Sequence, residues 1–184
     1  MGKLKVIPCK IEGLYVVEPE VIGDARGYFI ETYQQKDFAE AGLDMVFVQD
    51  NQSMSVKHVL RGLHFQKQYP QGKLVRVVRG AVYDVAVDIR KDSPTFGQWF
   101  GMELSAENKK QFYIAEGFAH GFYVVSEEAE FCYKCTDFYH PGDESGIAFD
   151  DPDIGIKWPI KDRKQLILSE KDKTWAGLHT TISF

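Results

Sequence analysis

The chain has 184 residues, enough for one domain with a buried core, and 44% of them are hydrophobic and 27% charged. Its formal net charge of -5 argues against a nucleic-acid binder, and no stretch approaches the roughly 18 consecutive apolar residues of a membrane span. Because the opening residues also lack the apolar core of a signal peptide, we expect one cytoplasmic domain over residues 1–184, with an N-terminal strand arm and an irregular C-terminal tail.

The first half of the chain reads as short strands separated by turns. Residues 4–22 are rich in Val and Ile and predict one or two strands, and residues 28–33 predict another after a turn around Arg26. Residues 34–41 carry the clear helical pattern of this half, closed by a glycine. Residues 47–55 mix a short apolar run with amide and carboxyl side chains, so we interpret them as a polar loop or a functional segment.

The stretch from Arg61 to Arg90 places ionisable residues within strand-like alternation, and we take it as the centre of the fold. Gly80 marks a turn, after which alternation puts two sets of side chains on opposite faces of a strand. One face carries Tyr83, Val85, Val87 and Ile89, and the other carries Asp84, Ala86, Asp88 and Arg90. If the sheet curls into a small barrel, one such face lines a cavity in which a ligand can bind.

The second half continues as short strands. We expect a turn and a strand in residues 93–105, two short strands around a loop that carries His120, and a strand in residues 130–136. Residues 150–159 are loop-like, and the remainder is polar and irregular or briefly helical. Many short strands with Gly and Pro turns and almost no helix predict an all-β fold, either an antiparallel barrel or a two-sheet jelly roll, with a few short helices.

His64 is the strongest catalytic candidate, because histidine alone titrates near neutral pH without perturbation. Arg61 and Lys73 lie near it in sequence, and a buried cluster of such groups needs anionic partners or an anionic ligand. Arg61 and His64 have opposite parity on a regular strand, so they share a pocket only if the backbone bulges, which Gly62 permits. Tyr133 on an inner sheet face is either a proton donor or a core tyrosine.

Metal-binding patterns in the chain are weak. Cys132 and Cys135 form a C-x-x-C pair, but residues three apart on a strand point to opposite faces and no second pair completes a zinc site, so we expect two buried thiols. Where a metal-binding cupin barrel has an H-x-H motif, this chain has His64, Phe65 and Gln66, and a lysine follows where a carboxylate is needed. We therefore expect no catalytic metal.

Five motifs in this order resemble the dTDP-4-dehydrorhamnose 3,5-epimerase family: RGLHFQ, PQGKLVRVVRGAVYDVAVDIRKDSPTFGQW, GFAHGFYV, YKCTDFYHPGDESGI and DPDIGIKWP. The resemblance runs from about Gly23 to about residue 172. It implies a cupin-like jelly roll, a homodimer, and an isomerase that works without cofactor on dTDP-4-dehydro-6-deoxy-D-glucose in the dTDP-L-rhamnose pathway. Two departures, Ala115 in place of a proline and Phe149-Asp150 in place of Trp-Asn, leave every catalytic candidate intact.

The resemblance also implies roles for single residues. His64 matches the general base of the family, and Asp172 matches the carboxylate that orients it. Tyr133 matches the proton donor, Lys73 the lysine beside the sugar ketone, and Tyr139 the aromatic that stacks on thymine. The other positions that match nucleotide- or sugar-binding residues are Arg26, Glu31, Gln49, Asp50, Asn51, Arg61, His120, Glu144 and Lys171.

Three alternative functions stay open at this stage. A relative that inverts only carbon 3 or only carbon 5 of the sugar keeps the same histidine, tyrosine and lysine. A non-catalytic cupin-like module would bind a nucleotide sugar, although simple binding needs no proton donor opposite a base. The third alternative is a metal-dependent cupin enzyme, which metal analysis of the purified protein would test.

Overall fold

The computed structural model describes residues 4–182, and antiparallel strands dominate them. The strands are β1 (Leu4–Pro8), β2 (Leu14–Pro19), β3 (Val21–Asp24), β4 (Gly27–Ile30), β5 (Gln49–Val56), β6 (Leu60–Gln66), β7 (Lys73–Arg79), β8 (Ala81–Asp88), β9 (Trp99–Ser105), β10 (Gln111–Ile114), β11 (Phe118–Val124), β12 (Glu128–Cys135) and β13 (Glu144–Gly146). The helical segments are α1 (Gln35–Glu40), α2 (Leu178–Thr181) and the short 3-10 turn η1 (Arg163–Gln165). Within residues 4–182 no helix is long and apolar enough to cross a bilayer.

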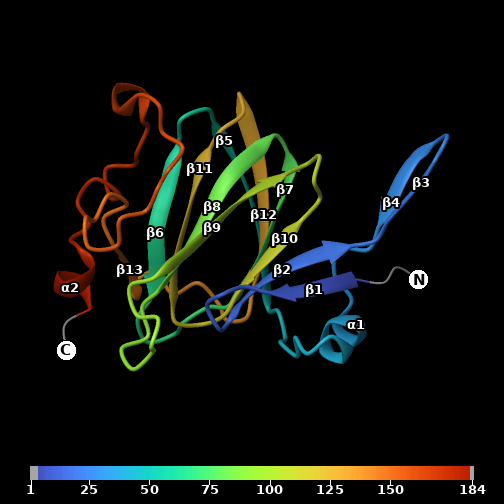
Figure 1. Cartoon of the computed structure of the whole chain (residues 1–184), viewed down its shortest axis with the longest axis horizontal. Coiled ribbons are helices and arrows are strands. Elements are labelled where there is room, and N and C mark those ends of the chain that lie inside the picture. Colours follow the sequence, from blue (N-terminus) through green and yellow to red (C-terminus); the bar gives the residue numbers. More distant parts are fainter. Residues whose placement is uncertain (1–3, 183–184) are drawn as a thin grey trace.

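Two sheets pack face to face to form the body of the molecule (Figure 1). The larger sheet has the order β1-β2-β10-β7-β12-β5, and the smaller has the order β13-β6-β11-β8-β9. Because neighbours in space are often distant in sequence and every pairing between these strands is antiparallel, the topology is that of a jelly roll. The structure therefore confirms the predicted all-β, cupin-like class.

The inner faces of the two sheets share one hydrophobic core. Val75 and Phe112 of the larger sheet pack with Val82, Ala86 and other residues of the smaller sheet, and all of them are buried. Burial of this kind stabilises a fold by about 25 cal/mol for each Å² of apolar surface removed from water. The core occupies one part of the space between the sheets, and the polar residues described below occupy the rest.

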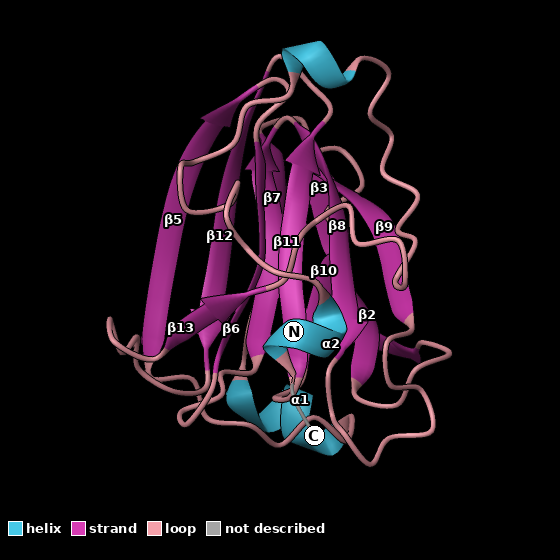
Figure 2. Ribbon diagram, turned by 90° about the vertical axis from the view of Figure 1, so that its left-hand side faces the viewer, coloured by secondary structure: helices cyan, strands magenta, loops and turns pink. Residues whose placement is uncertain are grey.

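The smaller sheet is buried on both faces. Ala86 belongs to the core between the sheets, whereas Val85 and Val87 pack in a second cluster with Leu178 of α2, so the predicted alternation along this strand is confirmed. Figure 2 shows the chain after β13, with α2, crossing the outer face of β11 and β8.

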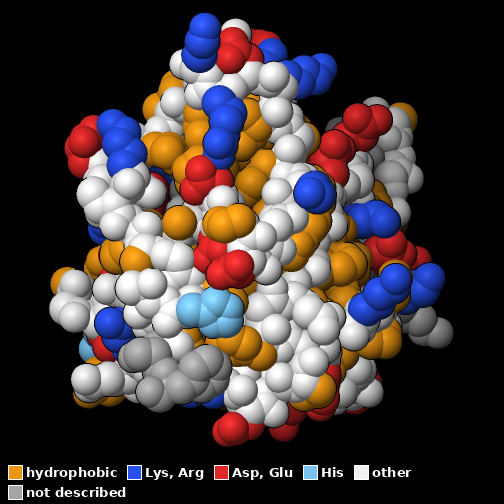
Figure 3. Space-filling model, turned by 60° about the vertical axis from the view of Figure 1, so that its left-hand side comes forward, with side chains coloured by type: hydrophobic (Ala, Val, Ile, Leu, Met, Phe, Trp, Pro, Cys, Tyr) orange, Lys and Arg blue, Asp and Glu red, His pale blue; other side chains and the backbone are white. Residues whose placement is uncertain are grey.

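On this side of the molecule, side chains of both charges are interspersed with apolar ones, and no large patch of a single sign is visible (Figure 3).

The hairpin formed by β3 and β4 projects away from both sheets (Figure 1). Its strands pair only with each other, and the side chains of Tyr28 and Phe29 are 61% and 62% exposed. Arg26 lies in its turn, as the glycines around this position predicted. The hairpin therefore presents apolar surface that the rest of the described chain does not cover. An isolated two-stranded hairpin is only marginally stable in water.

Three sequence expectations need correction. Residues 49–56 form strand β5 at the edge of the larger sheet, because each of them pairs with β12, so the polar-loop interpretation was wrong. His120 lies within strand β11 and not in a loop. Residues 31–33 follow the end of β4 and are not part of a strand, whereas the helix expected over residues 34–41 is present as α1.

Candidate active site

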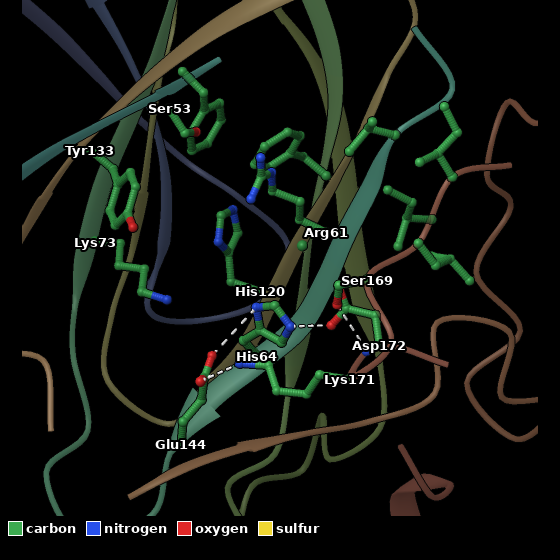
Figure 4. Close-up of a pocket in the computed structure, with 17 residues that line it drawn as sticks. Ser53, Arg61, His64, Lys73, His120, Tyr133, Glu144, Ser169, Lys171 and Asp172 are labelled. Carbon is green, nitrogen blue, oxygen red and sulfur yellow. Dashed lines mark hydrogen bonds and ion pairs between the residues drawn. The ribbon is translucent and has the colours of Figure 1, made fainter. Parts of the chain in front are cut away.

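A cavity of about 620 Å³ lies between the two sheets. The larger sheet contributes Lys73 and Tyr133, and the smaller sheet contributes His64 and His120. Asp172 and its neighbours in the tail line the cavity as well (Figure 4). The structure therefore brings together all four residues predicted to be catalytic.

A backbone bulge in β6 allows Arg61 and His64 to share this cavity. Opposite β6, the partners of His64 and Arg61 on β11 are His120 and Phe122, so three steps on β6 match two on β11. The extra residue reverses the alternation of side chains, and Gly62 adopts a φ of 124°, which favours glycine. The predicted bulge is confirmed. Arg61 also donates a hydrogen bond from Nε to Ser55 Oγ at 3.0 Å.

His64 and Asp172 form a hydrogen-bonded pair. His64 Nε2 lies 2.5 Å from Asp172 Oδ1, and the Asp172 side chain is only 3% exposed. Burial alone would raise the pKa of Asp172, but hydrogen bonds, first of all from His64, hold this pKa below its ordinary value. An ionised carboxylate only accepts hydrogen bonds, so Nε2 of His64 carries the proton and Nδ1 is the nitrogen that can accept another.

Glu144 and Lys171 border the same histidine. Glu144 Oε1 lies 3.8 Å from His64 Nδ1, and Glu144 Oε2 pairs with the ammonium group of Lys171. Burial would raise the pKa of Glu144, but the bond from Lys171 and the nearby His64 hold it below its ordinary value. Tyr139 donates its hydroxyl hydrogen to the same carboxylate at 3.1 Å. Glu144, Lys171 and Tyr139 are thus brought together as predicted.

A second histidine–carboxylate pair lies deeper in the barrel. His120 Nε2 is 3.0 Å from both oxygens of Asp84, whose side chain has no exposed surface. Burial raises the pKa of Asp84, and the nearby His120 opposes this rise. Alternation along the strand placed Asp84 on one face, but Asp84 was not among the predicted site residues. A carboxylate within a strongly apolar strand was the available signal, because such a group needs a buried partner.

Lys73 and Tyr133 extend toward the pair of His64 and Asp172 from the opposite sheet (Figure 4). Burial lowers the pKa of Lys73, and nearby anionic groups, including Asp84 and Glu144, oppose this shift. Burial raises the pKa of Tyr133, so its hydroxyl keeps its proton at neutral pH. The arrangement places a proton acceptor on one wall of the cavity, and the Lys73 amine and a proton donor on the other.

A smaller pocket of about 300 Å³ continues from this cavity. The two share His64, Lys73, Tyr133, Glu144 and Lys171. The residues that line only the second pocket are Gln49, Asn51, Phe65, Gln66, Gln71 and Tyr139. Its amide groups and aromatic face suit a planar base that offers both hydrogen-bond donors and acceptors.

Three predicted site residues lie outside both pockets of this chain. Asp50 points to the outer face of β5, where its carboxylate pairs with Lys134 Nζ at 2.6 Å, because side chains alternate along the strand. Arg26 is 89% exposed on the hairpin and pairs with Asp24. Glu31 follows the hairpin directly and lines neither pocket.

The cysteines are free thiols, and only part of the expectation for them holds. Cys135 is buried and accepts a hydrogen bond from Asn51 Nδ2 at 3.7 Å. Cys132 is partly exposed, because it faces the outer side of β12. Within residues 4–182 no group of three or more His, Cys, Asp and Glu side chains is placed to hold a metal ion.

Comparisons with known proteins agree with this geometry. The family model described as dTDP-4-dehydrorhamnose 3,5-epimerase matches residues 8–180. The dTDP-4-dehydrorhamnose 3,5-epimerase of Methanothermobacter thermautotrophicus is 56% identical over 178 residues, which cover 97% of this chain and 96% of that protein. The dTDP-4-dehydrorhamnose 3-epimerase of Streptomyces niveus is 40% identical, over 91% of this chain and 85% of that protein.

A solved structure extends the likeness to three dimensions. The crystal structure of dTDP-6-deoxy-D-glucose-3,5-epimerase from Legionella pneumophila, in complex with dTDP-4-keto-L-rhamnose, superposes with a TM-score of 0.92 and 53% identity. The match covers 96% of this chain and 93% of that one. The chain therefore belongs to the dTDP-4-dehydrorhamnose 3,5-epimerase family, whose members are isomerases.

Proposed function

We propose that the chain inverts carbons 3 and 5 of dTDP-4-dehydro-6-deoxy-D-glucose to give dTDP-4-dehydro-L-rhamnose, in dTDP-L-rhamnose biosynthesis. The observation that carries the proposal is the arrangement of His64 and Asp172 on one wall of a cavity, with Lys73 and Tyr133 on the other. The binding module that only holds a nucleotide sugar is disfavoured, because it would need no such opposition of base and acid.

The reaction begins with removal of a proton next to the carbon-4 ketone. His64 Nδ1 accepts this proton, and Asp172 stabilises the imidazolium that forms, because its oxygen already lies 2.5 Å from Nε2. The electron pair of the broken C–H bond moves into an enolate, whose charge collects on the ketone oxygen. Lys73 meets that oxygen with a cation in a water-poor cavity, where preorganised charge lowers a barrier by several kcal/mol.

The second half-reaction returns a proton to the opposite face of the same carbon. Tyr133 is on the opposite sheet from His64 and stays protonated at neutral pH, so it is the proposed donor. The resulting tyrosinate regains its proton from solvent, and the imidazolium returns its own to solvent. No bond to a cofactor is formed or broken in this sequence, and no oxidant or reductant is consumed.

We propose that the smaller pocket binds the nucleotide end. Tyr139 offers a ring to stack on thymine, Gln49 and Asn51 offer amide groups, and the cationic Arg61 and Lys171 suit the diphosphate. His120 is proposed to contact the sugar from inside the cavity. Asp50, which faces away from both pockets, has no place in this arrangement within one chain.

We also propose that the protein is a homodimer and that its hairpin serves the partner's site. Arg26 and Glu31 match substrate-binding positions of the family, yet they line neither pocket of their own chain. The exposed apolar residues of the hairpin give it a surface that a second copy can cover. Light scattering should give twice the chain mass of 21.0 kDa.

A mixing experiment tests transfer of Arg26 between subunits. Arg26→Ala and His64→Ala subunits, each nearly inactive alone at low substrate, are refolded together. If Arg26 acts on the partner, the mixed dimer contains one site with both native residues, and activity returns to about one quarter of the native level for random pairing. If Arg26 serves its own chain, mixing restores nothing.

Heavy-water NMR tests the proposed reaction. The native protein and dTDP-4-dehydro-6-deoxy-D-glucose are mixed in deuterium oxide, and the product should carry deuterium at carbons 3 and 5 and have the L-rhamno configuration. Deuterium at carbon 3 alone would assign the protein to the single-inversion group, of which the Streptomyces niveus relative is a named example. Bound nucleotide sugar with no exchange at either carbon would leave only the binding module.

We further propose a cytoplasmic location, which the three free cysteines support.

A further inference from the structure

We infer that Trp175 is a positioning residue that fixes the Asp172 carboxylate against His64. This inference rests on the proposed function, since it concerns how the base of that reaction is held. Trp175 belongs to the tail and matches none of the motifs that pointed to the family.

The indole N–H of Trp175 points at the same oxygen that His64 uses. Trp175 Nε1 lies 3.2 Å from Asp172 Oδ1, and His64 Nε2 lies 2.5 Å from it. An indole nitrogen only donates, so this contact cannot exchange roles as a hydroxyl or an amide would. Two donors on one oxygen hold the carboxylate at a fixed rotation, with its negative charge directed at the imidazole.

The structure leaves room for this indole at Gly146. A side chain on Gly146 would begin 2.4 Å from Cε2 of the Trp175 ring, so the indole lies directly against the backbone of β13. In the sheet, Gly146 is the partner of His64, and the rings of Trp175 and His64 meet edge to face at 6.2 Å. Trp175 therefore contacts both members of the pair and also the strand that borders them.

The local turn explains why the tail needs such a contact. Asp172 is held by its backbone through a hydrogen bond from its N–H to Ser169 Oγ at 3.1 Å, but the tail around it belongs to no sheet. His64, by contrast, lies within β6. A catalytic pair with one partner on a rigid strand and the other on a turn depends on additional bonds to the turn.

The test replaces the indole without removing an aromatic ring. In Trp175→Phe the ring against Gly146 is kept and the N–H is lost. Trp158→Phe is the matched control, because Trp158 Nε1 donates a comparable bond of 2.8 Å to a backbone oxygen, that of Phe149, away from the cavity. We expect kcat of Trp175→Phe to fall about tenfold with KM within twofold, and deuterium uptake at both carbons to fall in parallel. Trp158→Phe should keep the native kcat.

The pH profile separates positioning from a merely structural role. The bond from Trp175 contributes to the lowered pKa of Asp172, so its loss raises this pKa. Asp172 then gains a proton at a higher pH, and kcat of Trp175→Phe should decline earlier on acidification than native kcat. The other charged groups around Asp172, which are His64, Glu144, Lys171 and Lys173, are unchanged in the variant.

Two results would overturn the inference. One is an equal loss of kcat in Trp175→Phe and Trp158→Phe, and the other is a native kcat with an unmoved acid limb in Trp175→Phe. If Trp175→Phe does not fold, nonsense suppression can place benzothienylalanine at position 175, which keeps the shape of tryptophan and replaces N–H by sulfur, and the same outcomes apply. Absence of exchange in the native protein would instead contradict the proposed function.

Discussion

Two histidine–carboxylate pairs border the cavity, and they are built in different ways, because Asp172 lines the cavity whereas Asp84 is buried behind His120. In the outer pair, His64 of β6 meets Asp172 of the tail, and hydrogen bonds hold the pKa of the carboxylate below its ordinary value. In the inner pair, His120 of β11 meets Asp84 of the adjacent strand β8, and burial raises the pKa of the carboxylate. The same two residue types thus form pairs in which the pKa of the carboxylate is shifted in opposite directions.

The difference indicates a division of roles. Interactions with His64, Ser169 and Trp175 lower the pKa of Asp172, so its carboxylate stays ionised at neutral pH and can support a histidine that becomes protonated during turnover. Asp84, by contrast, accepts its side-chain hydrogen bonds within residues 4–182 from His120, and it lies near Lys73. We therefore propose that the outer pair carries out proton transfer and that the inner pair balances charge within the cavity wall.

The largest expected effect separates the two histidines. His64→Ala should slow deuterium uptake at carbons 3 and 5 by roughly 10²–10⁴-fold, which is the usual contribution of general-base catalysis. His120→Ala should retain measurable uptake at both carbons. Single-turnover NMR in deuterium oxide measures both variants. Substantial uptake by His64→Ala would remove His64 as the base, and loss of all uptake in His120→Ala would make the inner pair catalytic.

Part of the fold around the two pairs was readable from the sequence, because it depends on local patterns. Alternation predicted the two faces of β8, and the opposite parity of Arg61 and His64 predicted a bulge at Gly62. Both follow from the two-residue period of a strand, which needs no knowledge of the fold. The inner face of its strand marked Tyr133 as a proton donor or a core tyrosine, and the resemblance to a family favoured the donor. The role of Asp172 came from the resemblance, since nothing around it in the sequence singled it out.

The rest depends on contacts between distant segments. Asp84 gained significance only when β11 placed His120 beside it, and Trp175 only when the tail folded over β13. Asp50 was selected as part of a Gln-Asp-Asn run, but its direction depends on pairing between β5 and β12, which a polar segment does not reveal. Sequence patterns predicted most strands, but they did not predict which side chains from distant segments meet at the cavity.

The next effect concerns the proton donor opposite the outer pair. Tyr133→Phe removes the hydroxyl and keeps the ring, so abstraction by His64 continues while protonation of the other face is impaired. We expect overall inversion to fall about 10²-fold, and exchange of the substrate's own protons to fall less. Comparing product formation with deuterium in recovered substrate measures the two steps. If this variant turns over at the native rate, another group is the acid.

The two carboxylates should also give opposite pH dependences of stability. Because the pKa of Asp172 is lowered by folding, its stabilising contribution is present above its unfolded pKa and is lost as pH falls through the folded pKa. Because the pKa of Asp84 is raised, its contribution is present below its unfolded pKa and is lost as pH rises through the folded pKa.

Thermal denaturation of two variants from pH 2 to pH 8 measures this contrast, because the Asp172 contribution changes below its ordinary pKa and the Asp84 contribution changes above its ordinary pKa. Asp172→Asn should lose stability relative to the native protein as pH rises, whereas Asp84→Asn should gain on it. Parallel curves for the two variants would mean that folding shifts the pKa of both carboxylates in the same direction, and the proposed division of roles would lose its basis.

The smallest effect uses a third buried carboxylate that lies outside both pockets. Asp88 accepts hydrogen bonds from Arg90, Ser93 and Thr95, and although burial opposes it, these bonds hold its pKa at about 2. Since the unfolded value is higher, Asp88 stabilises the fold at neutral pH by about 2 kcal/mol, and this contribution is lost as pH falls toward 2. Asp88→Asn should therefore lower the denaturation midpoint at pH 7 and leave kcat unchanged. If kcat falls at a temperature where the variant is fully folded, the end of β8 must influence the cavity. The electrostatics of the two pairs would then depend on residues that contact neither of them.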